Sequence, residues 1–148
     1  MDNQKLSEKI DYTKELFGDS ILPEIPEAIS NNLKHNMWPL QEEAFKNFLF
    51  YENIKEGSNN DNVPNVEFVK KDEPTHLMFN MATGSGKTML MAACILHYMH
   101  LGYRKFLFIT NQTNILDKTE ENLINKLHQK YLFDDQLMIN SERVELKK

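Results

Sequence analysis

The chain has 148 residues, enough for one domain with a modest hydrophobic core. Hydrophobic residues make up 41% and charged residues 26%, which is typical of a globular protein. No apolar run reaches the about 18 residues of a membrane helix, so we expect no membrane partner. The net charge of −5 argues against a nucleic-acid coat protein. A polar start without a signal-peptide core and a single cysteine, Cys94, predict a cytoplasmic protein.

Residues 1–54 are interpreted as an N-terminal helical segment. We expect a short helix within residues 1–20 and a second one from Glu24 to Leu33. Leu40 to Tyr51 carries apolar side chains on one face, and Pro39 suits the first turn of that helix. Residues 55–73 contain glycine, proline and a Ser/Asn/Asp run, which indicates a surface loop or insertion.

Apolar runs and helical patterns alternate in residues 74–148. Thr75–Asn80 and Lys105–Thr110 are predicted to be buried strands, followed by helices at Lys87–His100 and Asn111–Lys130. Strands that are apolar throughout favour parallel pairing. The predicted fold class is therefore α/β, with residues 74–148 forming the first, incomplete part of a parallel sheet.

Two local features accompany this pattern. Gly102 is placed to cap the helix that ends at His100. The segment from Leu137 to Leu146 alternates around Asn140-Ser141 and predicts a hairpin. The packing residues expected on the helix 87–100 are Leu90, Ala93, Cys94, Leu96 and Met99.

The most informative segment is Ala82-Thr83-Gly84-Ser85-Gly86-Lys87-Thr88, between the first expected strand and its helix. A glycine-rich loop in this position presents backbone N–H groups to phosphates, at the positive end of the helix dipole. Lys87 can reach the β- and γ-phosphates, and the Thr88 hydroxyl suits a Mg²⁺ ligand. The strict pattern requires glycine at position 81, where this chain has Met81. The alternative is a chance Gly/Ser loop with a solvated lysine.

A second signal is Trp38-Pro39-Leu40-Gln41, before the loop in the chain. A glutamine amide offers both an acceptor and donors, so Gln41 can pair with the N6 amino group and N7 of adenine. Taken alone, Gln41 would be a surface residue in the first turn of a helix.

These motifs, with Phe106–Leu116, resemble the first half of the first RecA-like domain of superfamily-two helicases, over residues 36–130. The chain is most similar to the helicase (Res) subunits of type III restriction enzymes and their DEAD/DEAH relatives, in which a methionine before Ala-Thr-Gly is common. The resemblance implies a P-loop NTPase that binds ATP and Mg²⁺ through Gln41 and Thr83 to Thr88, with Lys87 as the catalytic residue.

The same resemblance implies a nucleic-acid partner. The residues Thr110, Asn111, Gln112 and Thr113 match the motif that touches the nucleic-acid backbone in these helicases. The expected partners are DNA, with RNA as an alternative, and a methyltransferase (Mod) subunit. Helix capping by Asn111 or Thr113 is an equally good interpretation of this segment.

Hydrolysis in this superfamily needs an acidic pair and an arginine from a second RecA-like domain. The one acidic candidate, Asp134-Asp135, precedes a polar hairpin, so we interpret it as an acidic turn. We therefore expect the front part of a larger helicase/endonuclease, inactive on its own. An incomplete sheet would leave strand edges uncovered, which predicts marginal stability or self-association.

Other interpretations stay open. Within helicases, the chain could belong to a type I restriction motor, a repair helicase or an RNA helicase. A different P-loop enzyme, such as a kinase, or a non-catalytic nucleotide-binding remnant are the other classes. His97 and His100 are expected to be ordinary histidines rather than metal ligands, and the methionines around the loop to fill the core.

Overall fold

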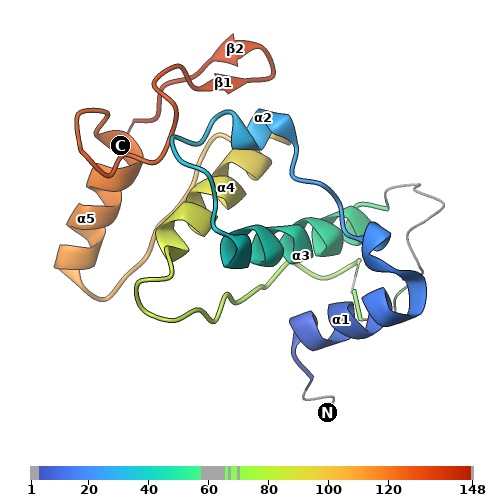
Figure 1. The fold of residues 1–148 in the computed structure, drawn as a ribbon. Helices are drawn as coiled ribbons and strands as arrows, with labels where there is room; N and C mark the ends of the chain where they lie inside the picture. The colour runs from blue at the N-terminus through green and yellow to red at the C-terminus, as the bar shows by residue number, and fades with distance from the viewer. Residues whose placement is uncertain (1–3, 58–65, 67, 70, 148) are drawn as a thin grey trace. The chain divides into compact units, whose positions relative to one another are not determined.

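The computed structural model describes residues 4–57, 66, 68–69 and 71–147 (Figure 1). The chain divides into two compact units. The first unit is Met1–Ile25 with Glu42–Asn80, and the second unit is Pro26–Gln41 with Met81–Lys148. The elements are α1 (Leu6–Phe17), the 3₁₀ helix η1 (Asp19–Ile21), α2 (Glu27–Ser30), α3 (Pro39–Lys55), α4 (Lys87–His100), α5 (Thr113–Ile124), β1 (Met138–Ile139) and β2 (Glu142–Arg143). Every helix in the described part of the chain is too short or too polar to cross a membrane.

The first unit is built around a small apolar cluster. Its α1 begins with a capping interaction, because the Glu8 carboxylate accepts the N–H of Lys5 at 3.1 Å. One face of α1 then buries Ile10 against the C-terminal half of α3 and the chain that follows. The buried members of the cluster are Ile10, Ile21, Phe50, Ile54 and Val69.

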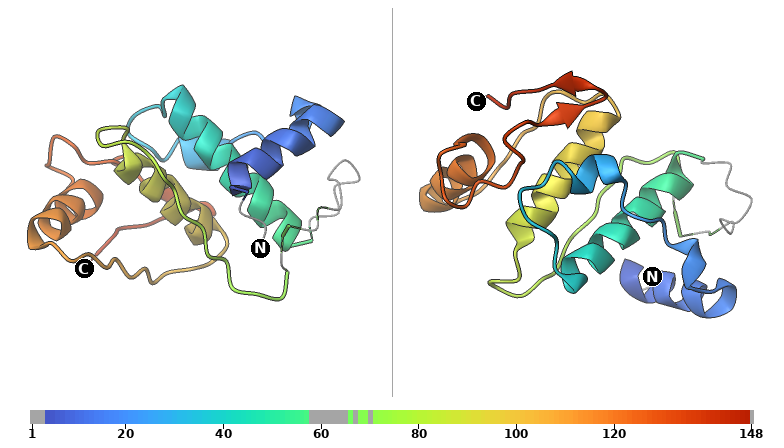
Figure 2. Two further views of the ribbon diagram at one scale, coloured as in Figure 1. Left: turned by 90° about the horizontal axis from the view of Figure 1, so that it is seen from below. Right: turned by 45° about the horizontal axis from the view of Figure 1, so that its top comes forward.

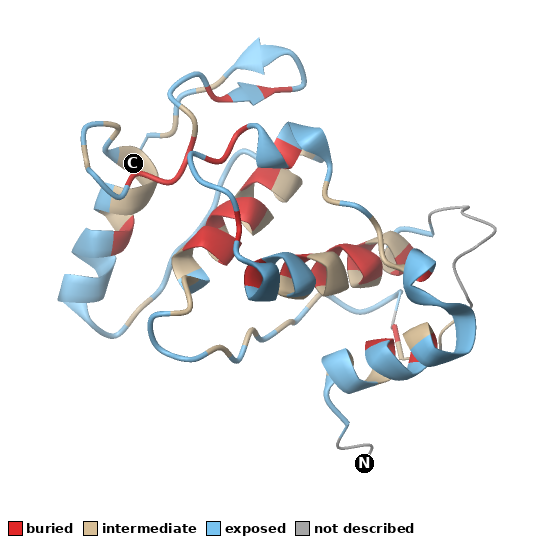
Figure 3. Cartoon of the chain, viewed as in Figure 1, coloured by how far each residue is buried: buried red, intermediate tan, exposed pale blue. Residues whose placement is uncertain are grey.

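The second unit is organised by α4. The apolar side chains on its inner face are buried, as Figure 3 shows by the red residues along this helix. Of the packing residues expected there, Leu90, Ala93, Leu96 and Met99 are at most 2% exposed, whereas Cys94 is half-buried. Helix α2 and strand β1 pack against α4, and α2 lies beside α4 in both views of Figure 2.

The C-terminal end of α4 has the predicted glycine cap. Gly102 has φ +99°, a conformation that costs little only without a Cβ atom. Its N–H donates to the carbonyl of Met99 at 3.0 Å, and the N–H of Tyr103 donates to the carbonyl of Tyr98 at 2.9 Å. These two bonds form a Schellman motif, so the helix ends at His100 as its sequence predicts.

Asn32 joins the segment after α2 to the C-terminal hairpin. Its Nδ2 donates to the carbonyls of Ala28 and Met138, and its Oδ1 accepts the N–H of Met138, each at 2.7 Å. Beside it, Leu33 forms an isolated antiparallel bridge with Phe133. Asn32 is 5% exposed, so its amide satisfies backbone groups that would otherwise be buried without partners.

The predicted hairpin is confirmed. Met138 pairs with Arg143 and Ile139 with Glu142, so the turn consists of Asn140 and Ser141. Both turn residues have positive φ, 51° and 68°, which is the geometry of a two-residue hairpin turn that matches strand twist.

The predicted parallel sheet is not confirmed. In the described residues the sheet consists of the β1–β2 pair, and neither 75–80 nor 105–110 is a strand. The second segment is not buried either, since Leu107 is 86% and Ile109 is 80% exposed (Figure 3). Apolar side chains favour a strand, but a strand forms only where its backbone finds a neighbouring strand to pair with.

The helix bounds also differ from the predicted ones. Helix α2 covers four residues, Glu27–Ser30, rather than Glu24–Leu33. It begins late because Pro26 disfavours helical geometry at the preceding residue. It ends early because Leu33 forms a β-bridge with Phe133. Helix α5 ends at Ile124 rather than Lys130. There, the Asn125 side chain accepts the N–H of Leu127 at 3.1 Å, which favours a turn over further helix.

The other predicted elements agree better with the structure. The expected helices within residues 1–20, at Leu40–Tyr51 and at Lys87–His100 correspond to α1, α3 and α4, and Pro39 is the first residue of α3. Most of the predicted loop 55–73 lies outside the described residues.

We predict that Asn32→Ala lowers the free energy of unfolding by about 2–4 kcal/mol, because it leaves the N–H and C=O of Met138 without this partner. The matched control is Asn31→Ala, an exposed neighbour, for which we expect a change within about 0.5 kcal/mol. Urea denaturation of both variants is the measurement, and equal losses would contradict a specific role for Asn32.

We also predict an alkaline loss of stability that depends on Tyr131. Burial raises the pKa of Tyr131, and the carboxylates of Asp135, Asp134 and Glu145 raise it further. Because the folded-state pKa lies above the ordinary value of about 10, this stabilisation is complete below about pH 10 and is lost as the pH rises through the folded-state pKa. Unfolding measured between pH 8 and 11 should therefore show a shallower alkaline decline in Tyr131→Phe; an unchanged decline would exclude Tyr131 as its source.

Candidate nucleotide-binding site

The glycine-rich loop lies directly before α4, as its sequence predicts. Gly84 has φ +83°, and Gly86, the residue before the helix, has φ +78° and ψ 36°. These left-handed conformations are unfavourable for residues with a Cβ atom. The two glycines therefore allow the loop to turn sharply into the first turn of α4.

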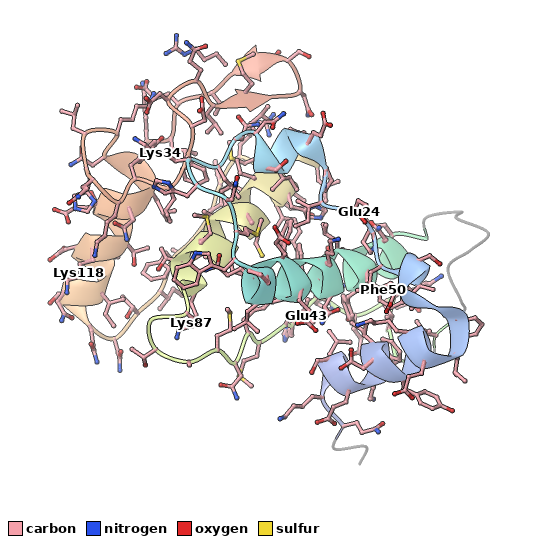
Figure 4. The ribbon with its side chains drawn as sticks, viewed as in Figure 1. Glu24, Lys34, Glu43, Phe50, Lys87 and Lys118 are labelled. Atoms are coloured by element: carbon pink, nitrogen blue, oxygen red, sulfur yellow. The ribbon has the colours of Figure 1, made fainter. Side chains whose placement is uncertain are left out.

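The side chain of Lys87 folds back over this loop. Its Nζ donates to the carbonyl oxygens of Met81 and Ala82, each at 2.9 Å. The Ser85 hydroxyl donates to the same Ala82 carbonyl at 2.7 Å, which tightens the turn. Figure 4 shows Lys87 at the N-terminal end of α4. An ammonium group has three N–H donors, so two carbonyl partners leave a third donor for an anionic ligand.

Gln41 is the residue that connects the start of α3 to the loop. Its Nε2 donates to the carbonyl of Ser85 at 2.8 Å, and its Oε1 accepts the N–H of Trp38 at 2.9 Å. All of these residues belong to the second unit, and Gln41 is only 4% exposed. A carboxamide has two N–H donors and two acceptor positions. These bonds use one donor and one acceptor position, so one donor and one acceptor position remain.

Gly86 is required by this packing as well as by its backbone conformation. A methyl group in place of its hydrogen would collide with Nε2 of Gln41. A methyl group at Gly84 would meet nothing within 4 Å. The two loop glycines therefore differ, since only Gly86 makes room for another side chain.

The electrostatics of the loop suit an anion. Helix α4 has 14 residues and no acidic residue in its first turn, so no carboxylate offsets its positive dipole end. Lys87 adds a positive charge at this end, and the half-buried Thr88 lies in the same turn. Thr83 is exposed on the loop, where its hydroxyl is accessible. The positive end of this helix dipole and the charge of Lys87 are both favourable for an anion.

The segment Thr110–Thr113 lies at the start of α5. Asn111, Gln112 and Thr113 are exposed, and Thr110 is half-buried. The expected alternative, capping by Asn111 or Thr113, is not seen, since Gln112 precedes the helix and its side chain makes no capping bond. The N–H of Gln112 donates weakly to the Thr110 hydroxyl at 3.4 Å. These polar groups are thus available to a ligand.

Asp134 and Asp135 form the predicted acidic turn. One carboxylate oxygen of Asp134 accepts the N–H of Gln136 at 2.8 Å, and a carboxylate oxygen of Asp135 lies 3.7 Å from Nζ of Lys34. The bond to Asp134 closes the turn, whereas the exposed ion pair of Asp135 contributes little.

The histidines of α4 and the methionines near the loop are the other candidate functional residues. The ring nitrogens of His100 lie 3.1 Å from Oδ1 of Asn140 and 3.2 Å from the carbonyl of Ala28. Within the described ranges, no three or more His, Cys, Asp or Glu residues gather in a metal-binding arrangement. Met89 and Met99 fill the core as expected, but Met78 is 88% exposed.

A hollow of about 370 Å³ lies on α5. It is lined by Asp117, Glu120, Glu121, Ile124 and Asn125. Three carboxylate side chains would repel a triphosphate, so we do not place the nucleotide there.

The sequence did not predict the backbone contacts of this site. The carbonyls of Met81 and Ala82 bind Lys87, and the N–H of Trp38 binds Gln41. Every residue except proline carries the same backbone groups, so no sequence signal could have identified these partners.

We predict that Gly86→Ala destabilises the chain more than Gly84→Ala. Both variants carry the left-handed backbone cost of about 1–2 kcal/mol, but only Gly86→Ala adds the collision with Gln41, about 1–3 kcal/mol. Chemical denaturation measures the difference. The effect of Gly86→Ala should shrink in a Gln41→Ala background, and an undiminished effect would refute this contact as its cause.

Comparison with known proteins places the chain in a family. Residues 34–147 match the family described as type III restriction enzyme, res subunit. The chain is also 43% identical over 124 residues to the probable type III restriction-modification enzyme HindVIP Res subunit of Haemophilus influenzae. The match covers 84% of this chain but only 23% of that protein. No solved structure gives a significant match. The chain therefore belongs to the res subunit family of type III restriction enzymes, which implies a P-loop helicase fold.

Proposed function

We propose that Gln41 and residues 83–88 bind ATP with Mg²⁺, and that the chain is the ATP-binding front part of a DNA translocase in a type III restriction-modification enzyme. The observation that carries the proposal is the hydrogen bond from Gln41 to the carbonyl of Ser85. It joins the residue expected to read adenine to the loop expected to hold phosphate, within one unit of the chain.

In this proposal the two loop glycines, Lys87, Thr88 and Gln41 have distinct roles. Gly84 and Gly86 let backbone N–H groups surround the phosphates, and Lys87 contributes a point charge to the β- and γ-phosphates. Thr88 offers its hydroxyl to Mg²⁺, which neutralises phosphate charge when bound. Gln41 keeps one N–H for the N7 ring nitrogen of adenine, which accepts, and one acceptor position for the N6 amino group, which donates.

The activity of the whole protein is part of the proposal, because the chain spans about a quarter of the length of the curated relative that it matches. By resemblance to superfamily-two helicases, we propose that ATP hydrolysis in the complete protein drives movement on DNA before restriction. Thr110 to Thr113 would contact the DNA backbone, and a Mod subunit would be the partner in the cytoplasm.

A second candidate function is nucleotide binding without hydrolysis by this chain alone. The observation in its favour is the acidic turn, in which Asp134 and Asp135 bind Gln136 and Lys34. A carboxylate that accepts an N–H of its own turn, as Asp134 does, is less available to Mg²⁺ or a water molecule. We therefore expect the 148-residue chain to bind ATP weakly without turning it over, with residues 74–148 as the first part of an ATP-binding domain.

We predict that Lys87→Ala weakens Mg²⁺–ATP binding about tenfold or more, because hydrogen bonds to charged groups contribute about 1.5–3 kcal/mol. The matched control is Lys118→Ala, an exposed lysine on α5 that Figure 4 labels, and its affinity should equal that of the unmodified chain. Isothermal titration calorimetry measures both. A Lys87→Ala chain that binds ATP normally would exclude the loop as the phosphate site.

A further inference from the structure

A network of hydrogen bonds joins α2, the C-terminal end of α4 and the hairpin of β1 and β2. On one side of it, the buried amide of Asn32 binds the carbonyl of Ala28 and the backbone of Met138. On the other side, Nδ1 of His100 lies 3.1 Å from Oδ1 of Asn140, and its Nε2 lies 3.2 Å from the carbonyl oxygen of Ala28. His100 therefore connects the end of α4 both to α2 and to the hairpin turn.

Both oxygens that face the imidazole act as acceptors. The carbonyl of Ala28 has no proton to donate. The Asn140 amide is oriented by its Nδ2, which donates to the backbone carbonyl of His100 at 3.1 Å, so its Oδ1 is the atom that faces Nδ1 of the imidazole. A neutral imidazole carries one N–H, whereas the imidazolium carries two. Both contacts are therefore satisfied only when His100 is protonated.

The place of His100 in the fold also favours a positive charge. It is the last residue of α4, where the backbone carbonyls of the final turn give the helix end a partial negative charge. Its side chain is half-buried, so the two contacts are partly shielded from water.

The charged and titratable side chains of the surrounding elements form no ion pair with His100 in the described residues. They are Glu27 on α2, His97 on α4, Arg104 directly after α4, and Glu142 and Arg143 on β2. The guanidinium of Arg104 donates to the carbonyls of Met99 and Tyr103. The contacts of the His100 ring are thus with uncharged acceptors, and no carboxylate is needed to hold its second proton.

We propose that protonated His100 is a pH-sensitive clasp that holds α2 and the hairpin turn on the end of α4. With both ring nitrogens protonated, Nδ1–H donates to Asn140 and Nε2–H donates to Ala28. Loss of one proton leaves a nitrogen lone pair against one of these oxygens, so that contact changes from attractive to repulsive. The unfolded chain lacks both acceptors. The clasp therefore stabilises the fold in acid, and its contribution is lost as the pH rises through the range in which histidine loses its charge, about pH 5 to 8.

Urea denaturation of the full chain at pH 5.5 and at pH 8 tests the clasp. Relative to His100→Gln, the unmodified chain should lose about tenfold in its folding equilibrium constant between these two pH values, because hydrogen bonds from a charged donor are lost. The matched control is His35→Gln, which removes an exposed histidine of the same unit and should keep the pH dependence of the unmodified chain. Parallel pH profiles in the unmodified chain and His100→Gln would overturn the proposal.

NMR spectroscopy of the unmodified chain provides a test that does not depend on a stable variant. At pH 5.5 we expect two ring N–H signals of His100 that are protected from exchange with water, and at pH 8 only one. A ring without protected N–H groups at pH 5.5 would overturn the proposal. The hairpin supplies a second signal, because the N–H of Val144 donates to the carbonyl of Leu137 at 2.9 Å. After correction for the intrinsic pH dependence of exchange, this N–H should be less protected at pH 8, and equal protection at both pH values would show that the proton does not hold the hairpin.

Discussion

Burial of the inner face of α4 is the interaction on which the second unit depends. Leu90, Ala93, Leu96 and Met99 exclude water from this face, and α2 and β1 pack against the same helix. Helix α4 also continues directly from the glycine-rich loop. Its burial therefore fixes the position of the loop, and the hydrophobic effect that stabilises the unit also orients the positive end of the helix dipole.

The buried amide of Gln41 adds a second constraint at this end of the helix. It ties the backbone before α3 to the Ser85 carbonyl, and the lack of a Cβ atom at Gly86 gives it room. A buried amide that satisfies two backbone groups is costly to disrupt, so the loop and the start of α3 are coupled. The glycine-rich loop therefore depends on Gln41 as well as on α4.

The predictions that succeeded concern local interactions. The spacing of apolar residues predicted helix α4, and Gly102 predicted where it ends. Asn140 and Ser141 predicted the hairpin turn. Each of these features depends on residues only a few positions apart. The expected parallel sheet is not confirmed at Lys105–Thr110, because a strand needs backbone partners from elsewhere in the chain. In the described residues this segment is exposed, with Leu107 and Ile109 among its apolar side chains.

The sequence alone determined the family and the residue types of the glycine-rich loop, because short motifs identify both. It also determined the helix after the loop, because the apolar residues there recur with helical spacing. Only the tertiary structure decided that Gln41 is buried against Ser85, 44 positions away, and that Trp38 remains exposed beside it. The physical reason is that hydrogen bonds between distant backbone and side-chain groups depend on how the chain packs, and backbone groups carry no sequence signature.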